Sequence, residues 1–200
     1  FSKAPLMASH SSARALCDHS RNLDDELLLL FKKQGGVVQT VAFSAYVNTE
    51  KHNAFNAARI ALWRDEAEKK GYKVLDRDEI RQLNDEDREV YNERYREIVT
   101  EAAPQIEALK KEVIPVNVSD FVDHIDYMVK LIGIDHVGIS SDFDGGGGIE
   151  GWNDASETFN VTLELVKRGY TEEEIEKLWS GNLLRVMVEV EAVAAGIRRT

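Results

Sequence analysis

Residues 135–148 read DHVGISSDFDGGGG, and this stretch decides the fold class. Its first half is short and apolar, as in a buried strand, and its second half is too rich in glycine for regular structure. Asp142 follows the predicted strand directly. In parallel α/β folds the working residues lie at the carboxyl ends of strands, so Asp142 is a candidate functional acid. The alternative interpretation is an acid that caps a helix or solvates a loop.

Two further strands are predicted upstream of this stretch. Residues 5–9 (PLMAS) resemble the end of a buried strand, and residues 37–43 (VVQTVAF) are β-branched and apolar, as in a strand buried on both faces. Helices are predicted at about 26–33, after an N-cap at Ser119, at about 155–168, from the capping box that begins at Thr171, and at about 182–194. This alternation is typical of an α/β fold with a parallel sheet.

The number of predicted strands is small for such a fold. Three parallel strands would leave two unpaired sheet edges and an uncovered apolar face. A doubly wound sheet usually has more strands, and a closed (β/α)₈ barrel has eight. Either further strands escape the pattern, or these 200 residues are the tail of a larger fold.

The segment at about 49–113 has a different character from the rest of the chain. It is highly charged, and each of its predicted helices keeps one apolar stripe. Asn84, which three acids follow, is a predicted N-cap. The segment is either a partner-binding surface or a solvated helical insertion beside the main core, and the frequency of charged helices in proteins favours the insertion.

Composition excludes several classes of partner. The 25 Lys and Arg residues against 36 Asp and Glu give a net charge of −11, so nucleic acid and anionic membrane surfaces are not expected partners. Cys17 is the only cysteine, so neither an internal disulfide nor a cysteine zinc cluster can form. The chain begins with Phe1 and shows no export signal, so we expect it to start inside a longer gene product and assign it no compartment.

Two residues near the predicted first strand are candidates for a functional site. His10 stands where this strand ends, among small hydroxyl residues, and a neutral imidazole is the commonest zinc ligand. Its alternative role is a structural histidine that hydrogen-bonds in a turn. Arg21, eleven residues later, has the planar donor group that binds a substrate carboxylate. Its alternative is an ordinary salt bridge with Asp24 or Asp25.

The remaining polar residues receive structural interpretations. Cys17 with His19 is a poor nucleophilic pair because residues two apart do not face each other on a helix. The other three histidines are polar positions on helices or a turn; they are His52, His124 and His136. The glycines at 145–148 lack the lysine and hydroxyl residue of a phosphate-binding loop, and they indicate mobility or close approach to a ligand.

Taken together, four segments resemble the membrane dipeptidase family, also called renal dipeptidase or peptidase family M19. They are residues 5–13 (PLMASHSSA), 21–25 (RNLDD), 135–145 (DHVGISSDFDG) and 181–186 (GNLLRV). Their order and spacing make the resemblance specific, and they cover both ends of the chain. The charged segment between them looks like the insertion of bacterial members.

The resemblance implies a metal-dependent hydrolase that cleaves dipeptides. The implied fold is the C-terminal portion of a (β/α)₈ barrel over residues 1–200, with its last three strands and the helical insertion at about 49–113. His10 is then the family's last histidine ligand to one of two zinc ions, Arg21 holds the substrate carboxylate, and Asp142 exchanges protons with the attacking water and the leaving amine. Asp144 and Tyr46 line the same rim and are assigned no step.

The family's remaining site residues do not align with this chain. The His-x-Asp pair of the first strand, the bridging glutamate and two further histidines all lie upstream of the position of Phe1. We therefore expect the other five strands on another segment or chain, and the resemblance makes a homodimer plausible. Two other functions stay open, namely a different amidohydrolase-type enzyme and a non-catalytic binding domain in which His10 and Asp142 are structural.

Overall fold

The computed structural model describes residues 2–198, which divide into two compact units. Among these residues, one unit consists of 2–50 and 116–198, and the other is Lys51–Pro115. The second unit occupies nearly the same residues as the charged insertion predicted at about 49–113. A single barrel domain over residues 1–200 stays a prediction.

The first unit contains a parallel sheet of three strands in the order β1 (Met7–Ala8), β2 (Val37–Val41) and β3 (Val137–Ser140). The predicted parallel α/β class is therefore confirmed in this unit. The interpretation of residues 5–9 as the end of a buried strand was wrong, because β1 is a short strand at the sheet edge. Leu6 and Met7 are 49% and 48% exposed, since no strand pairs with their outer side in the described part of the chain.

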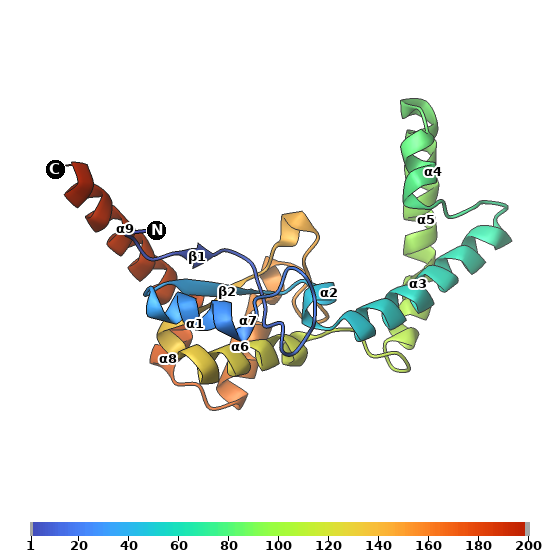
Figure 1. Cartoon of the computed structure of the whole chain (residues 1–200). Coiled ribbons are helices and arrows are strands. Elements are labelled where there is room, and N and C mark those ends of the chain that lie inside the picture. Colours follow the sequence, from blue (N-terminus) through green and yellow to red (C-terminus); the bar gives the residue numbers. More distant parts are fainter. Residues whose placement is uncertain (1, 199–200) are drawn as a thin grey trace. The chain divides into compact units, whose positions relative to one another are not determined.

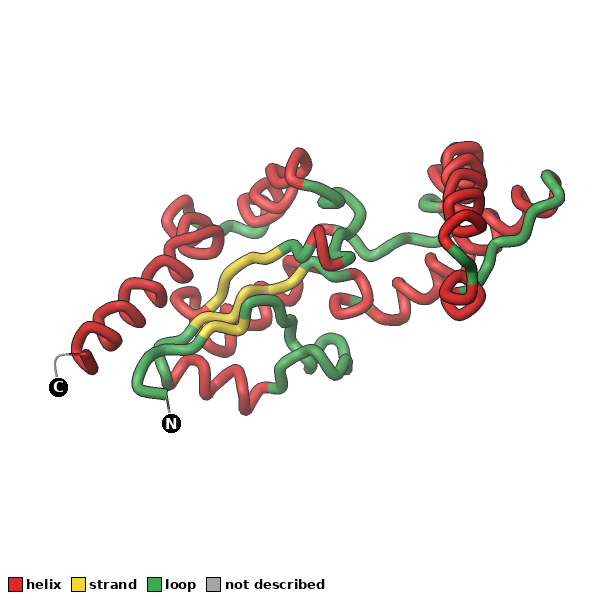
Figure 2. The backbone as a smooth tube through the Cα atoms, turned by 90° about the horizontal axis from the view of Figure 1, so that it is seen from above, coloured by secondary structure: helices red, strands yellow, loops and turns green. Residues whose placement is uncertain are grey.

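Helices cover one face of this sheet. Leu28 of α1 (Asp25–Lys33), residues of α6 (Val118–Ile132) and Leu165 of α7 (Thr158–Lys167) pack in one core with strand residues. Its members include Leu28, Phe121, Ile125, Met128, Ile132, Trp152, Leu165 and Leu178, and the strands contribute Val38, Val137 and Ile139. Figure 1 shows α1 and α6 beneath β2, and Figure 2 shows the strands running side by side when the sheet is viewed from above.

Two predicted helix N-caps are confirmed by the structure, and a third is wrong. Asn84 caps α5 (Asp85–Leu109), and Thr171 forms a capping box with Glu174 at the start of α8 (Glu172–Glu176). Ser119 does not cap α6, because Asn117 accepts hydrogen bonds from the backbone N–H groups of residues 119 and 120 and completes the box. An asparagine two positions earlier thus takes the role predicted for serine.

The C-terminal helices differ slightly from the predicted ranges. A 3₁₀ turn at Ala155–Glu157 precedes α7, and a π-helical turn at Lys177–Gly181 separates α8 from the last helix, α9 (Asn182–Arg198). Asn182 donates hydrogen bonds to the carbonyls of Ile134 and Val137, at 2.7 and 2.8 Å. The GNLLRV segment therefore ties α9 to the start of β3, which is a structural role.

The second unit is helical and strongly charged. It contains most of α3 (Thr49–Lys69), together with α4 (Arg77–Gln82) and α5, and the short α2 (Ser44–Val47) belongs to the first unit. Its buried apolar residues are few, namely Ala67, Ile98 and Ala102 among those described. No helix within residues 2–198 combines the length and the apolar character that crossing a membrane requires.

His124 of α6 is a structural residue that fixes the loop after β1. It is 2% exposed; its Nδ1 accepts a hydrogen bond from the Ala13 backbone N–H at 3.1 Å, and its Nε2 donates to the Val47 carbonyl at 2.9 Å. A proton on Nδ1 would break the bond from Ala13. The sequence interpretation of a polar helix position identified neither partner, because Ala13 and Val47 lie 111 and 77 residues away.

This burial predicts a dependence of stability on pH. Desolvation lowers the pKa of His124 below its usual value of 6.5. The unfolded chain therefore binds a proton near pH 6.5 while the folded chain does not, so the free energy of unfolding decreases as the pH falls below about 6.5. Urea denaturation at a series of pH values measures this decrease. His124→Gln should flatten it, and an unchanged slope in that variant would contradict the assignment.

Candidate functional site

The polar residues singled out in the sequence lie at the carboxyl edge of the sheet. Pairing continues to this edge, since Ser11 N donates to the Gln39 carbonyl and Ala42 N donates to the Ser140 carbonyl, both at 3.0 Å. His10 follows β1 and Asp142 follows β3. With β2 between these strands, their ends are about 10 Å apart. The carboxyl edge of the sheet thus carries the His10 imidazole after β1 and the Asp142 carboxylate after β3.

The structure brings His10 and Arg21 into direct contact. Arg21 Nη2 donates to His10 Nε2 at 2.8 Å, and Ser9 Oγ lies 2.6 Å from His10 Nδ1. Because a guanidinium can only donate, His10 presents the Nε2 lone pair to Arg21 and Nδ1–H to the serine. Both ring nitrogens are thus engaged within the chain, and a metal ion would bind at Nε2 only after Arg21 releases it.

Arg21 does not form the salt bridge that was its alternative interpretation. Asp24 pairs with Arg14 at 3.7 Å and caps α1, and Asp25 accepts the hydroxyl of Tyr127 at 2.8 Å. The Arg21 side chain is exposed, and His10 is its hydrogen-bond partner within residues 2–198. The guanidinium therefore keeps donors free for an anion at the carboxyl edge.

Asn22 organises the loop that connects His10 with Arg21. It is 1% exposed, and its carboxamide accepts from Ser12 N at 3.1 Å and donates to the carbonyls of Cys17 and Tyr46 at 2.9 and 2.7 Å. One side chain thus ties three segments together next to Arg21. Asn22 lies in the RNLDD segment, and its role is not apparent from the sequence, because an asparagine in a loop carries no pattern that reveals burial.

Asp142 has the backbone conformation of a specialised residue. Its φ of 56° and ψ of 34° place it in the left-handed region, where it is the one non-glycine residue within the described part of the chain. The N–H groups of Gly145 and Gly147 hold its carbonyl at 3.0 and 2.7 Å. Strained backbone of this kind clusters at functional sites.

The Asp142 carboxylate has no hydrogen-bond partner within residues 2–198 and does not cap the 3₁₀ turn that follows. The capping alternative is therefore wrong. Gly147 allows the tight turn, since a Cβ there would lie 2.0 Å from the Ser141 carbonyl oxygen. The glycine-rich segment thus allows two stretches of backbone to lie close together. Among the described residues, Asp142 makes no contact with His10 or Arg21.

The other rim residues have clear surroundings. The Tyr46 ring stacks on the rings of His19 and Phe43, each at 4.3 Å between centroids. Asp144 is exposed. Cys17 is buried, and its Sγ lies 3.2 Å from Thr49 Oγ1, so the structure gives this thiol a packing role and pairs it with no base.

The residues of this chain do not complete a metal centre by themselves. Within residues 2–198, no three His, Cys, Asp or Glu side chains gather in a group that could hold a metal ion. His10 offers one donor of the right chemistry, and structural zinc needs about four ligands and catalytic zinc about three. These residues alone therefore do not fit two zinc ions, and no metal-bound step follows from them.

The fold and the site together define a class of protein. A parallel α/β sheet carries an imidazole in contact with an exposed guanidinium, and a carboxylate, at its carboxyl edge, which is where α/β folds place their functional residues. The chain belongs to the membrane dipeptidase family, peptidase family M19, whose model matches residues 1–200.

Individual relatives agree with this family. The Dipeptidase aclJ of Aspergillus oryzae is 30% identical over 199 residues, which are 99% of this chain and 33% of that protein. The Dipeptidase 3 of Rattus norvegicus is 28% identical over 194 residues, 96% of this chain and 27% of that protein. The chain thus spans about a third of the length of the curated relatives it matches.

Solved structures show the same fold. The probable dipeptidase PvdM from Pseudomonas aeruginosa is 38% identical, with a TM-score of 0.63 over 96% of this chain and 46% of that one. A metallo peptidase from Rhodobacter sphaeroides, liganded with a phosphinate mimic of the dipeptide L-Ala-D-Ala, is 20% identical with a TM-score of 0.59. It covers 94% of this chain and 37% of that chain, and at this identity it supports the fold alone.

Proposed function

We propose that this chain is part of a zinc-dependent dipeptidase, a hydrolase that cleaves the peptide bond of dipeptides. The observation that carries the proposal is the placement of His10 and Asp142 after the carboxyl ends of parallel strands, in a chain of the M19 family. A carboxylate-binding arginine beside a metal-binding imidazole suits a small substrate with a free carboxyl end. Dipeptidases among the relatives support this substrate class.

Each site residue has one proposed role. His10 contributes one ligand to a zinc ion, and the remaining ligands come from polypeptide outside these 200 residues. Arg21 binds the carboxylate of the C-terminal residue of the substrate. Asp142 takes a proton from the attacking water and passes it to the leaving amine, a task for which its unpaired carboxylate is suited.

We further propose that the sheet is the last three strands of a (β/α)₈ barrel. The two outer strands have unpaired edges in the described part of the chain, and the helices beside them expose apolar residues. These residues are Leu27 and Leu30 on α1 and Phe159, Leu163 and Val166 on α7. Neighbouring helices of a complete barrel would cover them. The chain also covers less than half of the PvdM structure.

Intact mass under denaturing conditions, combined with zinc quantification, tests this proposal. A second polypeptide or a longer product, with about two zinc ions per assembly, would support a completed barrel. A monomeric 200-residue protein that melts cooperatively and binds no zinc would overturn the proposal of a shared site.

The role of Arg21 predicts a specific kinetic change. Arg21→Met in the complete enzyme should lower kcat/KM for a dipeptide about a hundredfold, because the charge-assisted contact to the carboxylate is lost. A dipeptide amide, which lacks this carboxylate, should be hydrolysed poorly by both proteins. Arg77→Met, at an exposed arginine of α4, is the matched control and should leave the rate unchanged.

Equal rates for Arg21→Met and the parent enzyme would contradict the carboxylate contact. Preference for the amide or for an N-acyl substrate would favour the other open function, a different amidohydrolase-type enzyme. Absence of zinc and of hydrolysis in the complete protein would favour a non-catalytic binding domain.

A further inference from the structure

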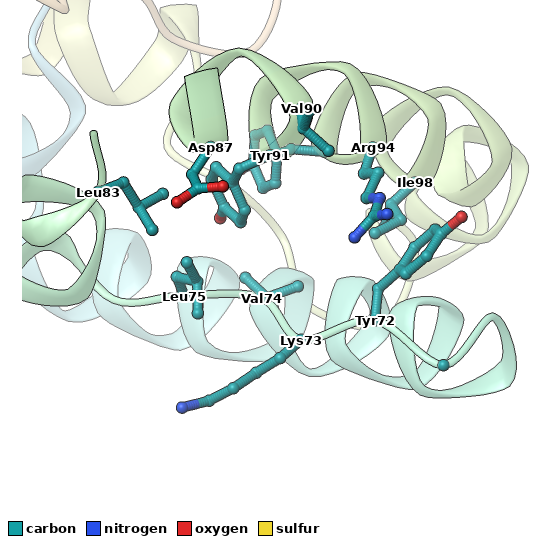
Figure 3. Close-up of a pocket in the computed structure, with 12 residues that line it drawn as sticks. Tyr72, Lys73, Val74, Leu75, Leu83, Asp87, Val90, Tyr91, Arg94 and Ile98 are labelled. Atoms are coloured by element: carbon teal, nitrogen blue, oxygen red, sulfur yellow. The ribbon is translucent and has the colours of Figure 1, made fainter. Parts of the chain in front are cut away.

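The second unit contains a pocket that the proposed dipeptidase site does not use. It has a volume of about 330 Å³ and lies between the segment that follows α3 and the first half of α5. Figure 3 shows its lining residues. Pockets for small molecules have volumes of about 300–1,000 Å³, so this one holds a compact ligand.

The walls of the pocket are apolar and aromatic. Aliphatic side chains from the irregular segment and from α5 line it, together with three tyrosines; they are Val74, Leu75, Leu83, Val90, Ile98, Tyr72, Tyr91 and Tyr95. The rings of Tyr91 and Tyr95 stack at 5.9 Å. Flat aromatic walls of this kind favour a ligand with an aromatic ring.

One cation of the pocket has no acidic partner. The Arg94 guanidinium lies 4.6 Å from the centroid of the Tyr72 ring, and no carboxylate within residues 2–198 pairs with it. Figure 3 shows this group pointing toward Val74 and Tyr72. Lys73 also lines the pocket, but it pairs with Glu79 and extends away from the hollow.

The acid of the pocket lies at its other end. Asp87 stands seven residues before Arg94 on α5, about 10 Å along the helix axis. One of its oxygens accepts a hydrogen bond from Asn84 Nδ2 at 2.8 Å. The free positive charge at Arg94 is therefore separated from the carboxylate of Asp87, and an anion is favoured at the Arg94 end.

We propose that this pocket binds a small aromatic carboxylate. The ring lies among the tyrosines and aliphatic residues, and the carboxylate receives hydrogen bonds from Arg94. The second unit has few buried apolar residues, so a ring bound in the pocket would add apolar contacts to this unit. Binding here is independent of dipeptide hydrolysis.

Calorimetric titration of 3-phenylpropionate into the purified protein tests this inference. We expect saturable binding with one site per chain, and much weaker binding of 3-phenylpropanamide, which lacks the charge. Arg94→Met should weaken binding of the acid about tenfold. Val90→Trp, which places a large ring against the pocket at a half-exposed position, should abolish it.

Two control variants test whether the acid binds at this pocket and not elsewhere on the protein. Arg96→Met removes the same charge from an exposed position of α5 outside the pocket and should bind as tightly as the parent protein. Arg21→Met should also bind normally, which excludes the carboxyl edge of the sheet as the binding site. Circular dichroism establishes that each variant is folded.

Three results would overturn the proposal. They are absence of binding up to the solubility limit of the acid, equal affinity for the acid and the amide, and equal loss in the Arg94 and Arg96 variants. Because binding is measured directly, these results leave the dipeptidase proposal unaffected. Likewise, failure to hydrolyse dipeptides would not affect the pocket.

Discussion

Asp142→Asn in the complete enzyme should lower kcat for dipeptide hydrolysis about a thousandfold while the fold is retained. The substitution keeps the size of the side chain and removes its capacity to accept and return a proton. Asparagine also tolerates the left-handed backbone that position 142 requires, so the turn into the glycine-rich loop should persist. The Asp142 carbonyl, which two glycine N–H groups hold, is unchanged by the substitution.

Asp144→Asn is the matched control for this experiment, since Asp144 is an exposed acid two residues later in the same loop. Its rate should equal that of the parent enzyme. Steady-state kinetics and thermal unfolding together distinguish lost chemistry from lost structure. If Asp142→Asn and Asp144→Asn have the same small effect, Asp142 is not the proton carrier.

Asn22→Ala should lower the free energy of unfolding by about 3 kcal/mol, because buried polar groups without partners are costly. The change leaves Ser12 N and the carbonyls of Cys17 and Tyr46 without this shared partner. Urea denaturation with a two-state fit measures the loss. Asn22→Asp should also destabilise the protein, since a carboxylate cannot donate to the two carbonyls.

Asn160→Ala provides the comparison for this prediction. Asn160 is exposed and donates one hydrogen bond, to the Gly151 carbonyl at 2.7 Å, so its loss should cost less than about 1 kcal/mol. Comparable losses at positions 22 and 160 would show that Asn22 does not organise the loop. In the complete enzyme, Asn22→Ala should also raise KM for dipeptides, because the loop that presents Arg21 is loosened.

The local features of the fold were predictable from the sequence. The predicted runs at 37–43 and 135–141 contain the strands β2 and β3, because β-branched residues favour extended backbone. Asn84 and Thr171 cap helices through backbone groups three residues away. The errors were also local. Asn117 competes with Ser119 for the same cap, and the run at 5–9 does not reveal that its strand lies at an edge.

The candidate site was predictable only as a set of residue types at strand ends. The positions of His10, Arg21 and Asp142 follow from the rule for parallel sheets and from the resemblance to the M19 family. Their contacts did not follow, because Arg21 had acidic neighbours at 24 and 25 that were equally available in the sequence. The structure commits those acids to Arg14 and Tyr127 and leaves Arg21 for His10.

The sequence by itself determined the parallel α/β class, most helix starts and the family, because these depend on periodicity, caps and motifs among neighbouring residues. Only the tertiary structure decided what holds the site. Asn22 and His124 form hydrogen bonds with residues up to 111 positions away in the sequence. Asp142 has a left-handed backbone conformation, and the N–H groups of Gly145 and Gly147 bind its carbonyl. Burial and hydrogen bonding between distant segments are properties of the folded chain, and no local pattern encodes them.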